Sequence, residues 1–301
     1  MTQGQETATA PFQPPAAQGS VTGRAVRGLL RFGRRKPLGA FGGLVVIILV
    51  ITAILAPMIA PHAPNTQSAQ IIESPSSEHA FGTDRYGRDV LSRTLYGARI
   101  SLWVGIVSLT IGVGAGTVLA LLSGYLGGIV DTVIQRIMDS ILAFPWLVLA
   151  LAIVSVLGNT LTNVMIAIGI LFVPNTARVV RSAVLTIREE AYVDAARVIG
   201  CTDWRIMFRH ILPNVMAPII VLVTVGLGSA IIVEASLSFL GLGTPAPAAS
   251  WGRDLAESRA YWYNDSHLFW PPTIAISLAV FGFNLLGDAL RDELDPRLRG
   301  R

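Results

Sequence analysis

Six long apolar runs alternate with shorter polar stretches along the chain. An α-helix needs about 20 consecutive apolar residues to cross a bilayer, and each run has about this length. Turn-forming pairs such as Gly127-Gly128 and Gly158-Asn159 separate neighbouring runs. The pattern predicts an all-α membrane protein with six transmembrane helices. The runs cover residues 38–59, 101–125, 132–157, 161–180, 215–242 and 268–286.

The composition agrees with a membrane protein. Of the 301 residues, 52% are hydrophobic and only 14% are charged, whereas soluble domains carry about 25% charged residues. The net charge of +4 does not indicate nucleic-acid binding, because basic residues crowd just before the first apolar run, as in a membrane-orientation signal. The single cysteine, Cys201, excludes an intrachain disulfide.

The distribution of Lys and Arg predicts that both termini are cytoplasmic. Six spans place the termini on one side, and connections rich in Lys and Arg remain in the cytoplasm. With the termini inside, the amino-terminal tail, the connection at 181–213 and the carboxy-terminal end hold most of the basic residues. The outer side receives Arg85, Arg88, Arg93, Arg99, Arg253 and Arg259.

These assignments divide the chain into five segments. The first is compositionally disordered, because it is rich in Gln, Thr, Ala and Pro before its basic residues. We expect a disordered basic cytoplasmic tail at 1–36, a first transmembrane helix at 37–60, an extracytoplasmic loop with an amphipathic helix at 61–98, a five-helix core at 99–290 that contains an inner loop at 181–213, and a cytoplasmic tail at 291–301.

The outer segment before the second run shows signs of a helix start. Thr83 and Asp84 are favourable helix-capping residues. Asp84 precedes Arg88, and Asp89 precedes Arg93, by four residues, a spacing that supports a helix. Two interpretations stay open: an interfacial helix that leads into the second run, or a docking surface for a partner outside the cell.

The third run is the least regular. It contains Asp139 and the step Phe144-Pro145-Trp146. A proline inside a span kinks the helix, and neighbouring groups must satisfy the freed carbonyl. The break is either a hinge or a static kink.

Small residues at four-residue spacing form ridges in two runs. Such ridges let helix backbones approach closely in lipid, so both ridges predict helix packing. The residues are Ser108, Gly112, Gly116, Ala120 and Gly124 in the second run and Gly226, Ala230, Glu234 and Ser238 in the fifth.

Glu234 interrupts the second of these ridges with an acid. A carboxylate deep in a span faces protein or water, not lipid. Glu234 is therefore either a structural acid bonded to a neighbouring helix or a residue that lines a polar path or its gate.

The inner connection at 181–213 is too long and too polar for a simple turn. Glu189 and Glu190 place negative charge at a helix start, where the helix dipole favours it. Apolar residues then recur at helical spacing and predict one face. These residues are Tyr192, Ala195, Ala196 and Ile199.

A glycine divides this connection into two helices. Gly200 can end the first helix in a left-handed cap. Thr202 or Asp203 can cap a second short helix that stops at Leu212-Pro213. We expect a helix–glycine–helix elbow that lies parallel to the membrane on its inner side; an ordinary amphipathic surface helix is the alternative.

The elbow resembles the EAA loop of permease subunits of binding-protein-dependent ABC importers. The matching residues are Asp194-Ala195-Ala196, Gly200 and, after eleven intervening residues, Leu212-Pro213. The family most often has glutamate where this chain has Asp194, so the charge is kept while its reach is one methylene group shorter.

Further stretches are similar to signatures of the dipeptide/oligopeptide branch, DppC/OppC type. The resemblance covers roughly residues 37–298. The stretches are Gly82-Thr83-Asp84, Gly87-Arg88-Asp89 and Ser92-Arg93 before the second run, Glu234-Ala235 and residues 237–243 in the fifth, and Gly287-Asp288, Leu290-Arg291-Asp292 and Leu294-Asp295-Pro296 near the carboxy terminus.

The resemblance implies a type I ABC importer permease fold in a bacterial-type inner membrane, with the elbow as a coupling helix. The chain would form half of a translocation path that works by alternating access. The implied partners are a second homologous permease subunit, two ATP-binding subunits and an extracytoplasmic substrate-binding protein. ATP and Mg would be used by the ATP-binding subunits, and no cofactor is expected on this chain. Dipeptides or oligopeptides are the expected substrates, with nickel chelates or glutathione as alternatives.

The resemblance and the patterns above assign candidate site residues. Those expected to couple to the ATPase subunits are Glu190, Tyr192, Asp194, Ala195, Ala196, Arg197, Gly200, Cys201 and Thr202. Those considered for the transport path or its gate are Glu234, Phe144 and Pro145.

Other functional classes explain less of the sequence. A phosphate-binding P-loop requires a lysine followed by Ser or Thr, but the only lysine is Lys36, followed by Pro37, so we expect a non-catalytic subunit. A membrane enzyme needs a convergent reactive set, which the motifs do not supply. A self-sufficient secondary transporter would explain six spans but not the elbow. No metal site is expected, because the histidines are scattered: His62, His79, His210 and His267.

Overall fold

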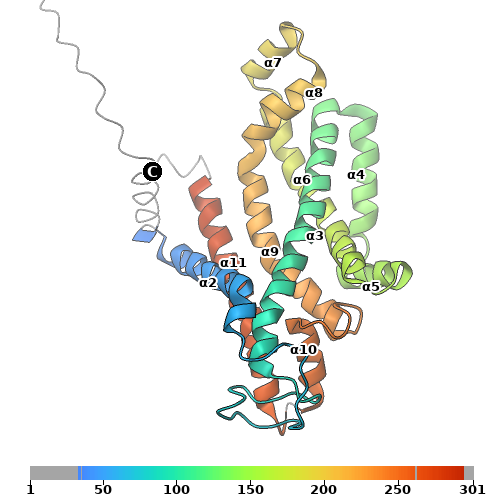
Figure 1. Ribbon diagram of the computed structural model, residues 1–301. Helices are drawn as coiled ribbons and strands as arrows, with labels where there is room; N and C mark the ends of the chain where they lie inside the picture. Colours follow the sequence, from blue (N-terminus) through green and yellow to red (C-terminus); the bar gives the residue numbers. More distant parts are fainter. Residues whose placement is uncertain (1–32, 35, 262, 295–301) are drawn as a thin grey trace, which may run out of the picture. The chain divides into compact units, whose positions relative to one another are not determined.

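The structure, a computed structural model, describes residues 33–34, 36–261 and 263–294 (Figure 1). The chain divides into two units, Met1–Pro37 and Leu38–Arg301. The predicted tail at 1–36 lies almost entirely outside the described residues, as does most of the tail at 291–301. Within the described residues the chain is helical or irregular, and the only β contact is an isolated bridge between Thr83 and Asp89.

Five helices are long and apolar enough to cross a membrane. A sixth crossing arises if a bent pair of shorter helices, α4 (Gly128–Leu142) and α5 (Trp146–Leu157), counts as one span. The predicted all-α membrane fold is therefore confirmed for the described residues, with five spans, or six if the bent pair counts as one. The five single helices are α2 (Pro37–Ile59), α3 (Val90–Leu126), α6 (Leu161–Ile187), α9 (Met216–Phe239) and α11 (Trp270–Leu294).

The third apolar run is not one kinked helix, as expected, but two helices at 93° to each other. The break falls between Leu142 and Trp146, and Pro145 occupies the cap position of α5 with an extended backbone, ψ 124°. Proline has no N–H to donate and drives the residue before it away from helical geometry. The predicted break is thus confirmed, and its size exceeds the predicted kink.

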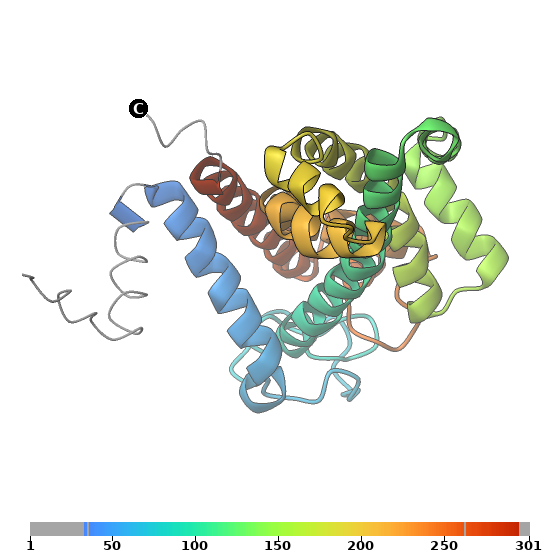
Figure 2. The same cartoon turned by 90° about the horizontal axis from the view of Figure 1, so that it is seen from above.

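Helices α3 and α6 pack against each other through the predicted glycine ridge (Figures 1 and 2). A methyl group at Gly112 would lie 2.5 Å from the carbonyl oxygen of Gly169, and one at Gly116 would lie 2.6 Å from Cβ of Thr176. These separations leave no room for a side chain. The interpretation of this ridge as a packing face is confirmed.

Helix α9 packs on α3 on one side and on α11 on the other. A methyl group at Gly226 would approach Cδ2 of Leu109 to 2.8 Å, and one at Gly287 of α11 would approach Cγ2 of Val225 to 2.5 Å. Helix α2 meets α11 at Gly42, where a methyl group would lie 2.7 Å from the carbonyl oxygen of Gly282. Only 17% of the α2 span is buried, which suits a helix surrounded by lipid.

The helix that was predicted to start at Thr83 or Asp84 begins later, and it is continuous with the second membrane helix. Thr83 and Asp84 do not start a helix; α3 begins at Val90, with Asp89 as its cap, whose Oδ2 accepts from the backbone N–H of Ser92 at 2.7 Å. The carboxylate of Asp84 instead accepts from the backbone N–H groups of Tyr86 and Arg88, at 2.8 and 3.0 Å. An Asp side chain bonded to the following backbone in this way competes with helix formation.

Within the part of the chain that the structure describes, the predicted amphipathic helix is not separate from the second span, since α3 runs unbroken for 37 residues. A helix of this length is about 55 Å long, whereas the hydrocarbon core of a bilayer is about 30 Å thick. Helix α3 is therefore longer than a membrane crossing requires, and it contacts α10 (Trp251–Ser258).

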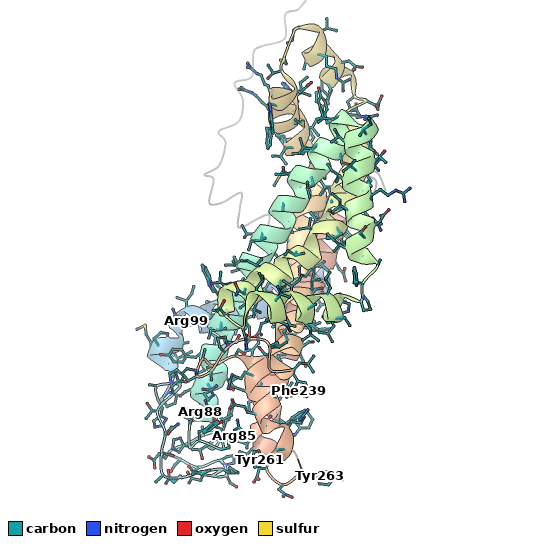
Figure 3. The ribbon with its side chains drawn as sticks, turned by 90° about the vertical axis from the view of Figure 1, so that its right-hand side faces the viewer. Arg85, Arg88, Arg99, Phe239, Tyr261 and Tyr263 are labelled. Atoms are coloured by element: carbon teal, nitrogen blue, oxygen red, sulfur yellow. The ribbon has the colours of Figure 1, made fainter. Side chains whose placement is uncertain are left out.

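The short helix α10 fastens the end of the bundle where α3 begins, called the outer end below. Trp251 is 1% exposed, and its indole Nε1 donates to the carbonyl oxygen of Thr94 on α3 at 2.8 Å. Figure 3 shows Arg85, Arg88, Tyr261 and other labelled side chains gathered at this end, away from the elbow.

Candidate functional site

The elbow lies at the end of the bundle opposite α10 (Figure 1). It begins with α7 (Ala191–Val198), turns at Gly200 and continues through α8 (Asp203–Arg205). A π-helical segment, η1 (Ile206–Ile211), and a 3-10 segment, η2 (Leu212–Val215), then lead into α9. The predicted helix–glycine–helix arrangement is present in the structure.

The turn between α7 and α8 depends on backbone conformation. Gly200 has φ +80°, in the left-handed region, as predicted. A methyl group there would meet no atom within 4 Å. Glycine is therefore favoured by the left-handed backbone conformation and not by a lack of space for a side chain. Glu190 occupies the cap position of α7, but its side chain makes no capping hydrogen bond.

The second half of the elbow differs from the prediction at its end. Thr202 caps α8, since its Oγ1 accepts from the backbone N–H of Arg205 at 3.4 Å. The helix does not stop at Leu212-Pro213, however, but passes through η2 directly into α9. Pro213 lies in the first turn of η2, where the helix changes from the π-helical to the 3-10 form.

The prediction that Ala196 shares one face of α7 with Tyr192 and Ile199 is wrong. Val193 and Ala196 are buried, at 0% and 4% exposure, in a cluster that includes Ile206 and Met207 of η1. Tyr192 and Ile199 are exposed. Helix α7 therefore has one face turned into the elbow and another turned outward, and the predicted set spans both.

The outward side of the elbow carries large apolar side chains. Val198 is 87% exposed, Ile199 78% and Trp204 60%. The rings of Trp204 and Phe208 stack with their centroids 5.3 Å apart. Exposed apolar surface of this kind marks an interaction site.

Polar contacts fasten the elbow to the inner end of α3. The hydroxyl of Tyr125 donates to Oδ1 of Asp203 at 2.8 Å. Just before the elbow, Arg188 at the end of α6 donates to the carbonyl oxygen of Gly124 at 2.8 Å. Arg197 lies over the Tyr125 ring, 5.4 Å from its centroid, and pairs with Asp194 at 2.8 Å. The interaction with the Tyr125 hydroxyl raises the pKa of Arg197 above its ordinary value. These contacts join the elbow to the end of α3.

Glu234 lies in a buried hydrogen-bond cluster near the outer end of α9. Its side chain is 0% exposed. Oε1 accepts from the hydroxyls of Ser238 and Thr244, at 2.7 and 2.9 Å, and Oε2 accepts from Ser101 of α3 at 3.5 Å. The contacts agree with a structural acid bonded to a neighbouring helix, whereas a role in the path or its gate stays a prediction.

The other two path candidates lie in a different environment. Phe144 is 58% exposed, and Pro145 is also exposed, at the break between α4 and α5. Asp139, near the end of α4, pairs with Arg178 of α6. The structure thus brings the coupling candidates together in one elbow. The path candidates do not share an environment, since Glu234 is buried whereas Phe144 and Pro145 are exposed.

Comparison with known proteins identifies the family. Residues 116–300 match the model of the binding-protein-dependent transport system inner membrane component. The chain belongs to this family. Residues 28–75 of the permease also match the N-terminal transmembrane domain of oligopeptide transport permease C. The predicted resemblance to this branch is confirmed.

Curated relatives cover most of the permease. It is 44% identical over 267 residues to the dipeptide transport system permease protein DppC of Alkalihalophilus pseudofirmus, with 88% of each chain covered. It is 42% identical over 267 residues to the glutathione transport system permease protein GsiD of Pectobacterium atrosepticum, with 88% of this chain and 89% of the relative covered. The permease is therefore a multi-pass inner-membrane component of an ABC transporter.

A solved structure supports the fold. The permease aligns with the inward facing conformations of the MetNI methionine ABC transporter at a TM-score of 0.51 and 18% identity, over 67% of this chain and 93% of that chain. This likeness concerns the fold alone, and it agrees with the predicted ABC importer permease fold.

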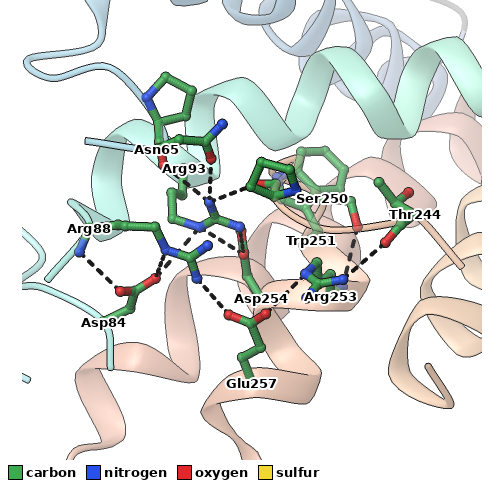
Figure 4. A network of polar contacts seen from close by, with 12 residues as sticks. Asn65, Asp84, Arg88, Arg93, Thr244, Ser250, Trp251, Arg253, Asp254 and Glu257 are labelled. Carbon is green, nitrogen blue, oxygen red and sulfur yellow. Dashed lines mark hydrogen bonds and ion pairs between the residues drawn. The ribbon is translucent and has the colours of Figure 1, made fainter. Parts of the chain in front are cut away.

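Sequence reasoning missed an ion-pair network at the outer end of the permease (Figure 4). Arg88 and Arg93 are 5% and 2% exposed. Arg88 pairs with Asp84 and with Glu257 of α10, both at 2.6 Å, and Arg93 donates to Oδ1 of Asp254 at 2.9 Å. The spacing of Asp84 and Arg88 was a visible signal, whereas the partners on α10 lie more than 160 residues away in the sequence.

Burial and charge act against each other in this network. Burial by itself lowers the pKa of Arg88, but Asp84 and Glu257 outweigh it and raise that pKa. Burial raises the pKa of Asp254 to about 6, although Arg93 acts in the opposite direction. The network fastens the loop before α3 to α10.

The histidines are not all scattered, in contrast to the prediction. The loop between α2 and α3 brings His62 and His79 beside Asp89, with one possible ligand atom of each residue within 4.8 Å of the others. Residues 17 and 10 positions apart lack the spacing of a helical metal motif, so this cluster could not be recognised from the spacing of its residues.

Proposed function

We propose that this permease forms half of the translocation path of an ATP-driven importer of short peptides. Its partners would be a second homologous permease subunit, two ATP-binding subunits and an extracytoplasmic substrate-binding protein. The permease itself would be non-catalytic, with ATP and Mg used by the ATP-binding subunits. The exposed elbow is the observation that carries this proposal.

The elbow has the features that a coupling element requires. It presents apolar side chains, among them Val198, Ile199 and Trp204, at the end that the Lys and Arg distribution assigns to the cytoplasm. Asp203 and Arg197 of the elbow contact Tyr125 of α3, so a push on the elbow would reach the membrane bundle. We assign coupling to the predicted residues, with Ala196 supporting α7 from inside and not contacting a partner.

The names of the relatives support a peptide-like substrate. They include permeases of dipeptide and glutathione transport systems, and glutathione is itself a γ-glutamyl tripeptide. Dipeptides or oligopeptides are the proposed substrates and glutathione is the alternative. A nickel chelate, the other alternative, has no support among these names.

Copurification with the ATP-binding subunits tests the proposal. The tagged permease would be expressed with its neighbouring transporter genes, and the recovered ATPase would be quantified for the intact chain and for Ile199→Asp. This substitution places a charge on an exposed elbow side chain that makes no buried contact, so the fold is expected to survive. We expect the ATPase to accompany the intact chain and to be lost from the variant.

A matched substitution on the membrane surface controls for nonspecific effects. Met58→Ser changes an 81% exposed apolar side chain at the far end of α2 and should leave ATPase recovery unchanged. Recovery of no ATPase with the intact chain, together with ATP-independent uptake in vesicles, would establish a secondary transporter instead. Uptake of labelled dipeptide or glutathione by the complete transporter then distinguishes the two substrates.

A further inference from the structure

The loop between α2 and α3 places two imidazoles and one carboxylate around a common point at the outer end of the permease. Nδ1 of His79 lies 2.9 Å from Oδ1 of Asp89, and Nδ1 of His62 lies 3.9 Å from the same oxygen. The two rings face each other with their centroids 4.8 Å apart. We propose that His62, His79 and Asp89 form a binding site for a divalent transition-metal cation of the Zn²⁺ type.

The separations suit a single small cation. Zinc binds imidazole nitrogen and carboxylate oxygen at about 2.0–2.2 Å in tetrahedral geometry, which places neighbouring ligand atoms about 3.3 Å apart. The observed separations of 2.9 and 3.9 Å from Oδ1 of Asp89 lie on either side of this value. All candidate ligand atoms lie within 4.8 Å of one another, so the side chains must draw together around a bound cation, and the partly exposed His62 ring has room to move.

The donor set selects the class of cation. Two imidazoles with one carboxylate suit zinc and the other later first-row divalent metals, whereas Mg²⁺ and Ca²⁺ prefer sites made of oxygen atoms. Three protein ligands leave a fourth position for water or another ligand. The site should therefore take up Zn²⁺ in the presence of excess Mg²⁺.

The ligands are held in place by surrounding contacts. Asp89 caps α3 through Oδ2, which accepts from the backbone N–H of Ser92 at 2.7 Å and leaves Oδ1 turned toward the imidazoles. The backbone N–H of His62 donates to Oγ of Ser92 at 3.0 Å, and that of His79 donates to Oγ of Ser76 at 3.1 Å. These hydrogen bonds fix the backbone at both histidines, and the cap fixes the carboxylate of Asp89.

One polar atom of the cluster lacks a hydrogen bond. Nδ1 of His62 is buried and has no hydrogen-bond partner, and a buried polar atom in that condition is destabilising. Coordination of a cation would satisfy it. The His62 side chain is 34% exposed while those of His79 and Asp89 are nearly buried, so a cation has a route from outside the cell along the His62 ring.

A bound cation would connect two separate parts of the outer end. His62 lies three residues after the end of α2, and Asp89 caps the first turn of α3. Coordination would join His62 to Asp89 directly. Without a cation, the conformation of the loop between them depends on hydrogen bonds and ion pairs. We therefore expect the metal to stabilise the permease against heat.

Metal binding by the full-length permease in its purified transporter tests the proposal. The protein would carry a tag without histidine, and Zn²⁺ would be titrated against a chromophoric chelator in excess Mg²⁺. We expect one equivalent of Zn²⁺ that the His62→Asn variant binds at least tenfold more weakly. X-ray absorption at the zinc edge should show two imidazole nitrogens in the coordination shell.

A histidine elsewhere in the chain supplies the matched control. His210 lies in the elbow, far from the cluster in the fold, and His210→Asn should keep the full equivalent. His62→Asn is expected to fold, because its ring is partly exposed and makes no hydrogen bond through Nδ1; the melting temperature of the metal-free variant checks this. Absence of binding to the intact protein, or equal binding by His62→Asn, would overturn the proposal.

Discussion

Tyr125, one residue before the end of α3, donates a hydrogen bond to Asp203 of α8, 78 residues later in the chain. The contact joins a membrane helix to the elbow, and Arg197 covers the ring of the same tyrosine. We predict that Tyr125→Phe, which removes only the hydroxyl, lowers transport several-fold while the permease still assembles with its ATP-binding subunits. The measurement is substrate uptake per ATP hydrolysed in proteoliposomes.

Tyr86→Phe is the control for this prediction. The hydroxyl of Tyr86 accepts from Arg85 at the outer end, away from the elbow, so its loss should leave the ratio of uptake to hydrolysis unchanged. An unchanged ratio in Tyr125→Phe would mean that this bond does not take part in coupling.

The backbone conformation of Gly200 predicts that some substitutions at this position are tolerated better than others. Its φ of +80° disfavours a side chain, although the space around it is open. A β-branched residue in the left-handed region costs roughly 1–2 kcal/mol, whereas asparagine is better tolerated there. We predict that Gly200→Val reduces transport and ATPase recovery and that Gly200→Asn retains most of both. Equal loss in the two variants would point to a contact of the glycine itself with the partner.

The elbow illustrates how much of the site the sequence predicts. Gly200 located the turn, and Thr202 was one of the two capping residues predicted, the other being Asp203, because local conformation decides these features. The sequence did not predict that Ala196 faces inward, since that depends on η1, a π-helical segment whose Ile206 and Met207 pack beneath α7. Short amphipathic helices with apolar residues on two faces do not reveal which face is covered.

The outer end was the least predictable part of the fold. Acid–base spacing at Asp84 and Arg88 suggested a helix, but the ion pair forms in a turn and extends to Glu257 on α10. The histidine cluster likewise depends on how an irregular loop folds. The periodic small residues of α3, in contrast, predicted its packing correctly, because in lipid a close helix contact requires them.

Glu234 allows a test of the two interpretations that the sequence leaves open. Its carboxylate accepts from Ser238, Thr244 and Ser101, and loss of such buried partners costs about 1–3 kcal/mol. We predict that Glu234→Ala lowers the melting temperature of the purified permease and that Glu234→Gln, which keeps one acceptor oxygen, lowers it less. If Glu234→Gln melts like the intact protein yet abolishes uptake, the residue has a role in the path or its gate.

Because Asp254 is buried and its pKa is raised, we predict that the free energy of unfolding depends on pH. Its pKa is about 6 in the folded protein, against about 3.9 for an unfolded aspartate. Between these values the folded state retains a proton that the unfolded state has released, so the free energy of unfolding falls as the pH rises from about 4 to about 6. Asn at this position does not titrate.

The expected measurement is the difference in melting temperature between the intact permease and Asp254→Asn across pH. We predict that this difference declines from pH 4 to pH 6 and is constant above pH 7. Loss of the ion pair to Arg93 shifts the whole curve but not its slope. A difference that rises over the same interval would show that Arg93 keeps the pKa of Asp254 below its ordinary value.

Two glycines of α3 provide a matched pair for the packing of the bundle. A methyl group at Gly112 would lie 2.5 Å from the backbone oxygen of Gly169 on α6, whereas one at Gly114 would meet no atom within 4 Å. Gly112→Ala must therefore separate α3 from α6, at a cost of about 1–3 kcal/mol typical of overpacking. Gly114→Ala adds the same methyl group on the exposed side and improves helix propensity. We predict a lower melting temperature and reduced yield for the first variant only, and equal behaviour of the two would contradict the close contact between α3 and α6.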